Sequence, residues 1–225
     1  CERLRRLAQQ HLDAAIQPLE YEADLQYPGA PASHSAAGGL TVRRLLNAYA
    51  RDPLFRQWAS SPAIRDWLTA YFGMTPVLST AHHNCVMTKH PSFGSQTGWH
   101  QDVRYWSFSQ TDLVSVWLAL GTETQENGGL FFVPGSHNAV FQPHQFDDKK
   151  FFRPDVADNT PWLAKAVCPE LQATDVVFFH CRTLHAAKGN STDKVKLSLV
   201  HTYYPESTAP LPGTRSASMP GIPLL

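Results

Sequence analysis

Two histidines and one aspartate in this chain have the residue types of a metal-binding set. His100 and Asp102 are separated by a single residue, and His185 lies much further along the chain. Two imidazoles and one carboxylate can hold non-heme Fe(II) on one face and leave the opposite positions open for a co-substrate and oxygen. These three residues are therefore our candidate metal ligands and, through the metal, the candidate catalytic residues.

A His-x-Asp pair is weak evidence by itself, because His11 and Asp13 form a second one. Apolar residues around His11 recur at helical spacing and predict a helix over residues 1–19, in which positions i and i+2 point well apart. Around His100, a preceding glycine and a following β-branched and aromatic run predict the start of a strand. Positions i and i+2 of a strand project from one face, so we expect His100 and Asp102 to share one ion.

His185 follows a short apolar run, residues 175–180, of the kind that forms a buried strand. A single histidine in such a place is more often a core or loop residue than a ligand. The position at the end of an expected strand, and a separation from His100 that a β-barrel could close, favour the ligand here.

Four further blocks of sequence occur in an order typical of one enzyme family. They are Trp-His-Gln-Asp at 99–102, Gln-Glu-Asn-Gly-Gly-Leu at 125–130, Val-Pro-Gly-Ser-His at 133–137, and the segment 175–191 around the distal histidine. With these blocks the chain, roughly from residue 45 to 204, resembles the phytanoyl-CoA dioxygenase family of Fe(II)- and 2-oxoglutarate-dependent oxygenases. The resemblance implies a mainly β protein, a double-stranded β-helix (a cupin-like jelly roll) with N-terminal helices.

The resemblance also implies a reaction. Iron held by His100, Asp102 and His185 would use O2 and 2-oxoglutarate to hydroxylate a small molecule, and 2-oxoglutarate would become succinate and CO2. Relatives that halogenate have lost the carboxylate, whereas Asp102 is present here, so hydroxylation is the expected outcome. The family accepts acyl-CoA thioesters, free acids, amino acids and natural products, and the sequence does not select among them.

The family places a basic residue eleven positions after the distal histidine, where it binds the far carboxylate of 2-oxoglutarate. That position is Lys196, although the usual residue is arginine. Arginine pairs with a carboxylate through a planar fork, while lysine offers only a point charge. Lys196 could instead be a solvated lysine at a strand edge, but Ser198 shares its face, and an ammonium directed into a barrel needs an anion.

Other co-substrate contacts are implied by the resemblance on the strand expected over residues 83–89. Its alternate residues His83, Cys85 and Lys89 share one face, which lines the co-substrate pocket in the family. Trp117 also aligns with a co-substrate contact, and it could equally be a core residue of an apolar strand over residues 113–120.

Composition agrees with one domain that is not built for nucleic acid or membrane surfaces. The chain has 225 residues, a formal net charge of +0 and a pI of about 7.3, so it carries no electrostatic footprint for either partner. The 17 prolines and the low charged fraction of 17% favour a loop-rich β architecture. Cys1, Cys85, Cys168 and Cys181 show no paired spacing, which predicts reduced thiols in a cytoplasmic compartment. The sequence leaves open a monomer or a homodimer.

We expect three parts: a mostly helical segment over residues 1–75, a jelly-roll core over 76–204 and an extended tail over 205–225. Further helices are predicted over 42–60 and 62–72, and a loop over 26–39. Residues 142–163 are expected to form a long excursion beside the site.

Three other functions fit parts of the sequence. A zinc enzyme or metal-binding module could use a different ligand set, namely His82, His83, Cys85, His180, Cys181 and His185, although the spacing of zinc fingers is missing. A non-hydroxylating cupin-like relative that has lost 2-oxoglutarate use is the second, and the change to Lys196 leaves room for it. A hydrolase is disfavoured, because residues 94–98 have the wrong order for a nucleophile elbow.

Overall fold

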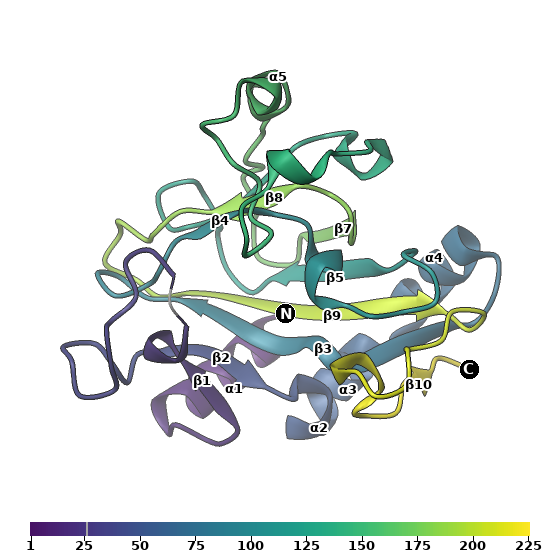
Figure 1. Ribbon diagram of the computed structural model, residues 1–225. Coiled ribbons are helices and arrows are strands. Elements are labelled where there is room, and N and C mark those ends of the chain that lie inside the picture. The colour runs from purple at the N-terminus through teal and green to yellow at the C-terminus, as the bar shows by residue number, and fades with distance from the viewer. Residues whose placement is uncertain (26) are drawn as a thin grey trace.

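The computed structural model describes residues 1–25 and 27–225, and two antiparallel sheets form its framework (Figure 1). The larger sheet has the strand order β1-β2-β3-β9-β5-β7, with β10 beside β3, and the smaller sheet has the order β4-β8-β6. The strands are β1 (Leu19–Tyr21), β2 (Val42–Leu46), β3 (Pro76–Lys89), β4 (Thr97–His100), β5 (Val114–Ala119), β6 (Leu130–Phe132), β7 (Val176–His180), β8 (His185–Ala187), β9 (Lys196–Pro205) and β10 (Ile222–Pro223). This arrangement confirms the predicted jelly roll.

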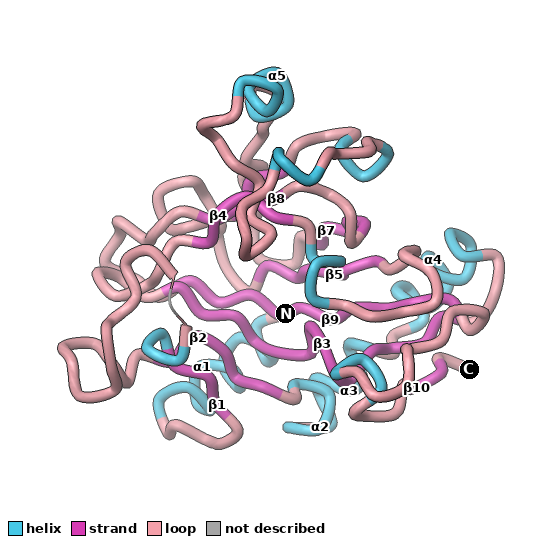
Figure 2. Tube along the Cα trace, in the orientation of Figure 1, coloured by secondary structure: helices cyan, strands magenta, loops and turns pink. Residues whose placement is uncertain are grey.

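The first four α-helices cover the face of the larger sheet that is turned away from the smaller one, whereas the fifth lies on the side of the smaller sheet (Figure 2). The α-helices are α1 (Glu2–Asp13), α2 (Ala48–Arg51), α3 (Pro53–Ala59), α4 (Pro62–Phe72) and α5 (Thr160–Leu163), and the 3-10 helices are η1 (Glu22–Asp24), η2 (Asp102–Tyr105), η3 (Ser136–Asn138), η4 (Pro143–Gln145), η5 (Ala157–Asn159) and η6 (Arg215–Ala217). Helix α1 buries Leu4 and Leu12 against the sheet, and α4 buries Leu68. Within the described residues, no helix has both the length and the apolar character needed to cross a bilayer.

Strand β9 shows how the larger sheet divides its side chains between two environments. Leu197 and Leu199 pack with the helices in one core cluster, and Tyr203 packs in another. Successive side chains of a strand point to opposite faces, so Lys196 and Ser198 point to the inner side, between the sheets. All ten residues of β9 are buried, because helices cover one face and the smaller sheet covers the other.

The predicted helix over residues 42–60 is wrong at its start. Val42–Leu46 form β2, which pairs with β3, and Leu45 is fully buried in the core. Asn47 then adopts a left-handed conformation with φ 56°, so the chain turns before the first short helix. Residues 42–46 form a strand because the neighbouring strand β3 supplies their hydrogen-bond partners.

The other predicted elements agree with the structure in part. Helix α4 confirms the prediction over residues 62–72, whereas α1 ends at Asp13 and β1 follows where the helix over 1–19 was expected to continue. The loop predicted over 26–39 begins at Gln26, which lies outside the described residues, and residues 27–39 contain turns and bends. The expected tail adds η6 and the short strand β10.

A buried ion pair ties β2 to the N-terminal segment. Arg43 is 3% exposed, and its Nη1 lies 3.2 Å from the carboxylate of the fully buried Glu22 and 2.6 Å from the Ser95 hydroxyl. Burial lowers the pKa of Arg43. Removing one partner of such a pair leaves an uncompensated buried charge.

We therefore expect Arg43→Met to lower the free energy of unfolding by about 3–5 kcal/mol, as measured in urea. Arg153→Met is the matched control, because the Arg153–Asp155 pair is even shorter, at 2.6 Å, but lies exposed. Its loss is expected to cost much less than the loss of the Arg43 pair, because water and salt screen an exposed pair. Equal losses in the two variants would show that burial does not set the value of the Arg43 pair.

Candidate metal centre and its pocket

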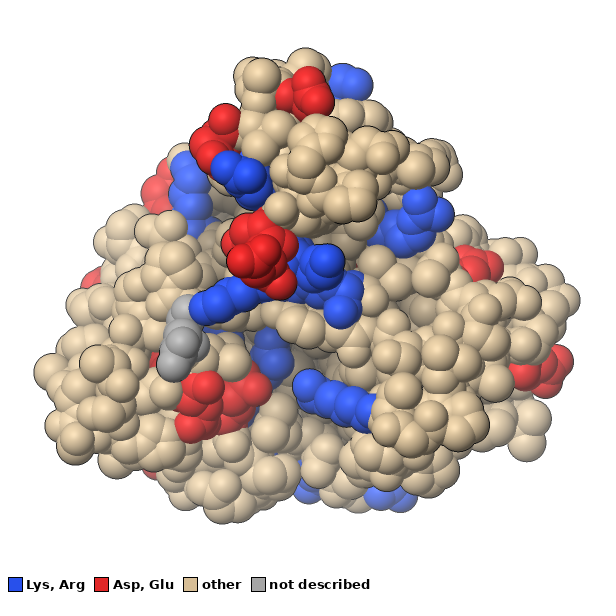
Figure 3. All heavy atoms as spheres, in the orientation of Figure 1, with Lys and Arg blue, Asp and Glu red and all other residues tan. Residues whose placement is uncertain are grey.

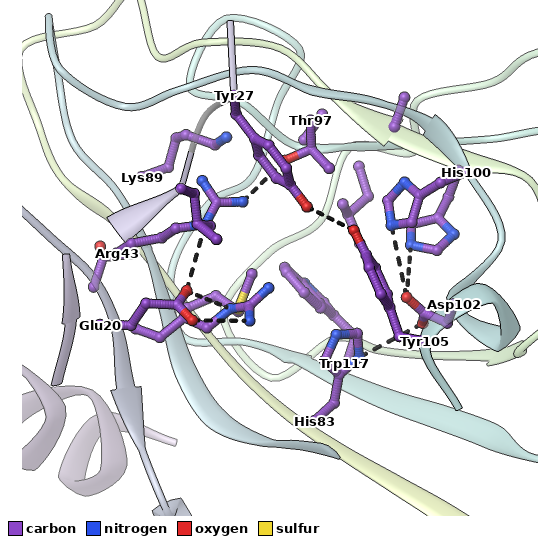
Figure 4. Close-up of a pocket in the computed structure, with 18 of the residues that line it drawn as sticks. Glu20, Tyr27, Arg43, His83, Lys89, Thr97, His100, Asp102, Tyr105 and Trp117 are labelled. Atoms are coloured by element: carbon purple, nitrogen blue, oxygen red, sulfur yellow. Dashed lines mark hydrogen bonds and ion pairs between the residues drawn. The ribbon is translucent and has the colours of Figure 1, made fainter. Parts of the chain in front are cut away.

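The three candidate ligands converge between the two sheets. His100 at the end of β4 and His185 at the start of β8 are directly paired, and their ring centroids are 4.2 Å apart. Asp102 Oδ1 lies 3.6 Å from His100 Nε2 and 3.5 Å from His185 Nε2. One ligand atom from each residue lies within 4.8 Å of the others, and all three residues are buried. Figure 4 shows His100 and Asp102 at one end of the pocket.

The reason predicted for this proximity was wrong. Strand β4 ends at His100, and Asp102 is the first residue of η2, so the two side chains do not project from one face of a strand. The 3-10 turn instead brings the carboxylate back toward both imidazoles. Ser115 on β5 donates a hydrogen bond to this carboxylate, with its Oγ 3.4 Å from Asp102 Oδ2.

Backbone carbonyls set the orientation of both imidazoles. His100 Nδ1 lies 2.8 Å from the carbonyl oxygen of Gly98, and His185 Nδ1 lies 3.0 Å from that of Thr183. A carbonyl only accepts, so each Nδ1 donates its proton, and Nε2, which faces Asp102, is the nitrogen that is available to a metal. The two nitrogens are thus prepared for a metal.

The charge states also suit a cation. Burial, with His100 nearby, lowers the pKa of His185 to about 4, so its imidazole is neutral at pH 7. Burial by itself would raise the pKa of Asp102, but the neighbouring His83, His185 and His100 outweigh it and hold that pKa well below its usual range. Two imidazole nitrogens and one carboxylate on one side, with a cavity on the other, fit Fe(II).

A cavity of about 200 Å³ lies against this cluster. Its wall carries Tyr105 and Trp106, which follow the metal motif directly, and Figure 4 shows Tyr105 and Tyr27 joined by their hydroxyl groups at 2.9 Å. Five basic side chains also border it: Arg43, Arg44, Lys89, Lys196 and Arg215. Figure 3 shows lysine and arginine side chains gathered around the hollow in the middle of this face.

Three of the predicted co-substrate contacts share one hydrogen-bond partner, Glu123, which was not predicted from the sequence. Lys196 Nζ lies 3.1 Å from Glu123 Oε2, and Ser198 Oγ donates to Glu123 Oε1 at 2.6 Å. Trp117 Nε1 donates to the same carboxylate at 3.1 Å. Glu123 is 1% exposed. The sequence offered one signal for it, namely that a buried Lys196 needs an anion, but did not say which of the acidic residues supplies it.

The other predicted contacts divide into two groups. His83 and Lys89 line the cavity; His83 Nδ1 lies 3.5 Å from Asp102 Oδ2, and Lys89 Nζ donates to the carbonyl oxygen of Ser95 at 2.7 Å. Burial, with Arg43 and Lys196 nearby, lowers the pKa of Lys89 to about 7. Cys85 is not among the lining residues but packs beside Trp117 in a core cluster, and burial raises its pKa to about 11; its contact with the co-substrate stays a prediction.

The alternative zinc set is not brought together. His82 hydrogen-bonds to Ser216, and His180 faces Asp112 at 3.5 Å. The Cys181 thiol donates to the carbonyl oxygen of Thr111. Among the residues that the structure describes, the cluster of His100, Asp102 and His185 is the one whose ligand atoms could surround an ion.

Comparison with known proteins places the chain in a family. The model of the family described as phytanoyl-CoA dioxygenase (PhyH) matches residues 2–198. A probable phytanoyl-CoA dioxygenase of Caenorhabditis elegans is 28% identical over 156 residues, which is 64% of this chain and 49% of the relative. The human peroxisomal phytanoyl-CoA dioxygenase is 29% identical over 62% of this chain and 42% of its own length. The chain thus spans about half the length of these relatives.

Solved structures agree on the fold. A non-heme α-ketoglutarate-dependent epimerase, SnoN, from nogalamycin biosynthesis superposes with a TM-score of 0.70 at 26% identity, covering 94% of this chain and 76% of the other. EctD from S. alaskensis in its apo form gives a TM-score of 0.74 at 19% identity over 96% of this chain and 72% of its own. The second likeness shows the jelly roll alone.

Proposed function

Because this chain belongs to the phytanoyl-CoA dioxygenase family of Fe(II)- and 2-oxoglutarate-dependent oxygenases, we propose that it hydroxylates a small molecule. The observation that carries the proposal is the buried cluster of His100, Asp102 and His185 at the wall of a cavity. Its two nitrogen donors and one carboxylate suit Fe(II) with open positions.

Different residues of this chain would hold the metal, orient its ligands and line the pocket in such a reaction. His100, Asp102 and His185 would hold iron, which supplies oxygen activation when it is coupled to the oxidative decarboxylation of 2-oxoglutarate to succinate and CO2. The carbonyl oxygens of Gly98 and Thr183 keep both imidazoles in the binding tautomer. Trp106, which is buried, and Tyr105 close the wall beside Asp102 and limit the access of water.

The presence of Asp102 supports hydroxylation over halogenation. Structural relatives catalyse more than one outcome, since SnoN is described as an epimerase and an EctD structure contains 5-hydroxyectoine with 2-oxoglutarate. The substrate, the oligomeric state and the reducing compartment expected from the cysteines stay predictions.

One observation favours a second candidate, a cupin-like metal protein that no longer uses 2-oxoglutarate. The ammonium of Lys196, which the family resemblance assigns to the far carboxylate of the co-substrate, is already paired with Glu123. The donors of the metal centre fit iron, whereas this end of the pocket does not present a free cation at Lys196.

The test requires no knowledge of the substrate. Metal-free protein is mixed under nitrogen with Fe(II), and then with 2-oxoglutarate, while the visible spectrum is recorded. We expect a weak charge-transfer band that needs both components, because 2-oxoglutarate chelates iron held by the protein. If iron binds but no 2-oxo acid produces a band, the second candidate replaces the first.

A further inference from the structure

Glu123 is buried and contacts two residues that line the cavity, Lys196 and Trp117, without being a lining residue itself. Its two carboxylate oxygens accept hydrogen bonds from Trp117 Nε1, Ser198 Oγ and Lys196 Nζ at 2.6–3.2 Å. Lys196 Nζ also donates to Ser198 Oγ at 2.9 Å, and it lies 5.1 Å from the centre of the Trp117 ring. Glu123, Lys196, Ser198 and Trp117 therefore form a closed polar group, which we call the Glu123 group.

Glu123 supplies Lys196 with the negative charge that the carboxylate of a bound co-substrate would otherwise supply. An ammonium has three hydrogen-bond donors, and Glu123 and Ser198 occupy two of those of Lys196. A buried lysine without an anion would be costly, and here the protein supplies the anion itself. A second carboxylate approaching Lys196 would meet the negative charge of Glu123, which offsets the attraction of the ammonium.

We propose that Glu123 is a specificity-determining residue for the co-substrate: its carboxylate takes the place in which the far carboxylate of a 2-oxo diacid would pair with Lys196. The pocket therefore discriminates only weakly between 2-oxoglutarate and a 2-oxo acid that chelates iron in the same way but has an uncharged tail. This inference rests on the proposed function, since it assumes that a 2-oxo acid binds at the iron.

Among the other basic side chains that border the cavity, Lys89 is the alternative partner for the far carboxylate that we test directly. It is the direct cross-strand neighbour of Lys196, lines the same cavity and donates to a backbone carbonyl, not to a carboxylate. If Lys89 received the far carboxylate, the preference for the diacid would persist in spite of Glu123. The experiment has to separate these two cations.

The experiment measures binding, not turnover. Fe(II)-loaded protein is titrated under nitrogen with 2-oxoglutarate and with 2-oxopentanoate, following the charge-transfer band and, separately, the shift of the thermal unfolding midpoint. The variants are Glu123→Gln, which keeps the size and the acceptor oxygen but removes the charge, and Lys89→Met. Glu126→Gln is the matched control, because Glu126 lies three residues away and is exposed.

We expect the wild-type protein to bind the two acids with dissociation constants within about 5-fold of each other. Glu123→Gln should tighten 2-oxoglutarate binding by about 10-fold or more, as expected for a restored hydrogen bond between charged groups, and leave 2-oxopentanoate within about 2-fold. Glu126→Gln should leave both dissociation constants at their wild-type values. Lys89→Met should leave the ratio of the two dissociation constants within about 2-fold of the wild-type ratio.

Two results would count against the inference in different ways. A wild-type protein that binds 2-oxoglutarate about 100-fold more tightly than 2-oxopentanoate overturns it. Loss of that preference in Lys89→Met would then assign the far carboxylate to Lys89, and its persistence would assign it to one of the arginines at the cavity. This comparison stands even if Glu123→Gln does not fold, because it begins with the wild-type protein. A complete lack of a band with either acid, with iron bound, overturns the proposed function and the inference with it.

Discussion

Asp102→Ala is expected to abolish oxygenation and to weaken Fe(II) binding by at least about 100-fold. Losing an outer-shell partner of a ligand already costs 10–100-fold in metal affinity, and Asp102 is itself the single carboxylate of the ligand set. Without it, two neutral imidazoles remain and no ligand compensates the charge of the metal. Fe(II) affinity is measured by anaerobic titration, and turnover by oxygen consumption with a 2-oxo acid present.

Asp112→Ala is the control for this change. Asp112 also faces a histidine, His180, at 3.5 Å, but it is half exposed and lies outside the metal cluster. Iron affinity should be unchanged in that variant. Wild-type iron affinity in Asp102→Ala would remove Asp102 from the ligand set, and with it the proposed metal centre.

A second large effect is expected in acid and depends on His201. This residue of β9 is fully buried against Trp58, and neither ring nitrogen has a hydrogen-bond partner among the described residues. Burial lowers the pKa of His201 to about 3, from 6.5 for an exposed histidine. Its neighbours on the adjacent strands are Asn84 and Val116, so no charged group in register favours the imidazolium.

The direction of the pH effect follows from proton uptake. Between pH 6.5 and pH 3 the unfolded chain protonates His201 while the folded chain does not, so the unfolded state binds more protons and stability falls as pH falls. Above pH 6.5 the contribution is absent. At 1.36 kcal/mol per pKa unit, His201 should cost about 2–3 kcal/mol by pH 4.5.

His201→Phe isolates this contribution from that of every other titrating group. We expect the variant to be as stable as the wild type at pH 7 or more stable, since it removes a polar ring without partners. The difference in the free energy of unfolding between the two proteins should then grow by about 2–3 kcal/mol as the pH falls from 7 to 4.5. A difference that does not change with pH would mean that His201 is not the acid-sensitive group.

The sequence alone determined the residue types at the metal centre and the order of the strands that carry them. A glycine, an apolar run and two histidines beside strand ends are local features, and strand pairing places His100 opposite His185 in the observed register. The family resemblance, with its four ordered blocks, identified the jelly roll because those blocks mark turns and strands of that fold. Local periodicity was wrong at residues 42–46, where the neighbouring strand β3 decides between helix and sheet, and it extended the first helix beyond Asp13.

Only the tertiary structure decided how Asp102 comes close to His100 and His185, and which anion pairs with Lys196. A 3-10 turn, not a strand face, carries Asp102, because the chain leaves β4 at His100. Glu123 and Lys196 are 73 positions apart, and no local pattern distinguishes Glu123 from the exposed Glu126 three residues later. The pairing of buried charges depends on which side chains the fold encloses together, and that information is absent from sequence periodicity.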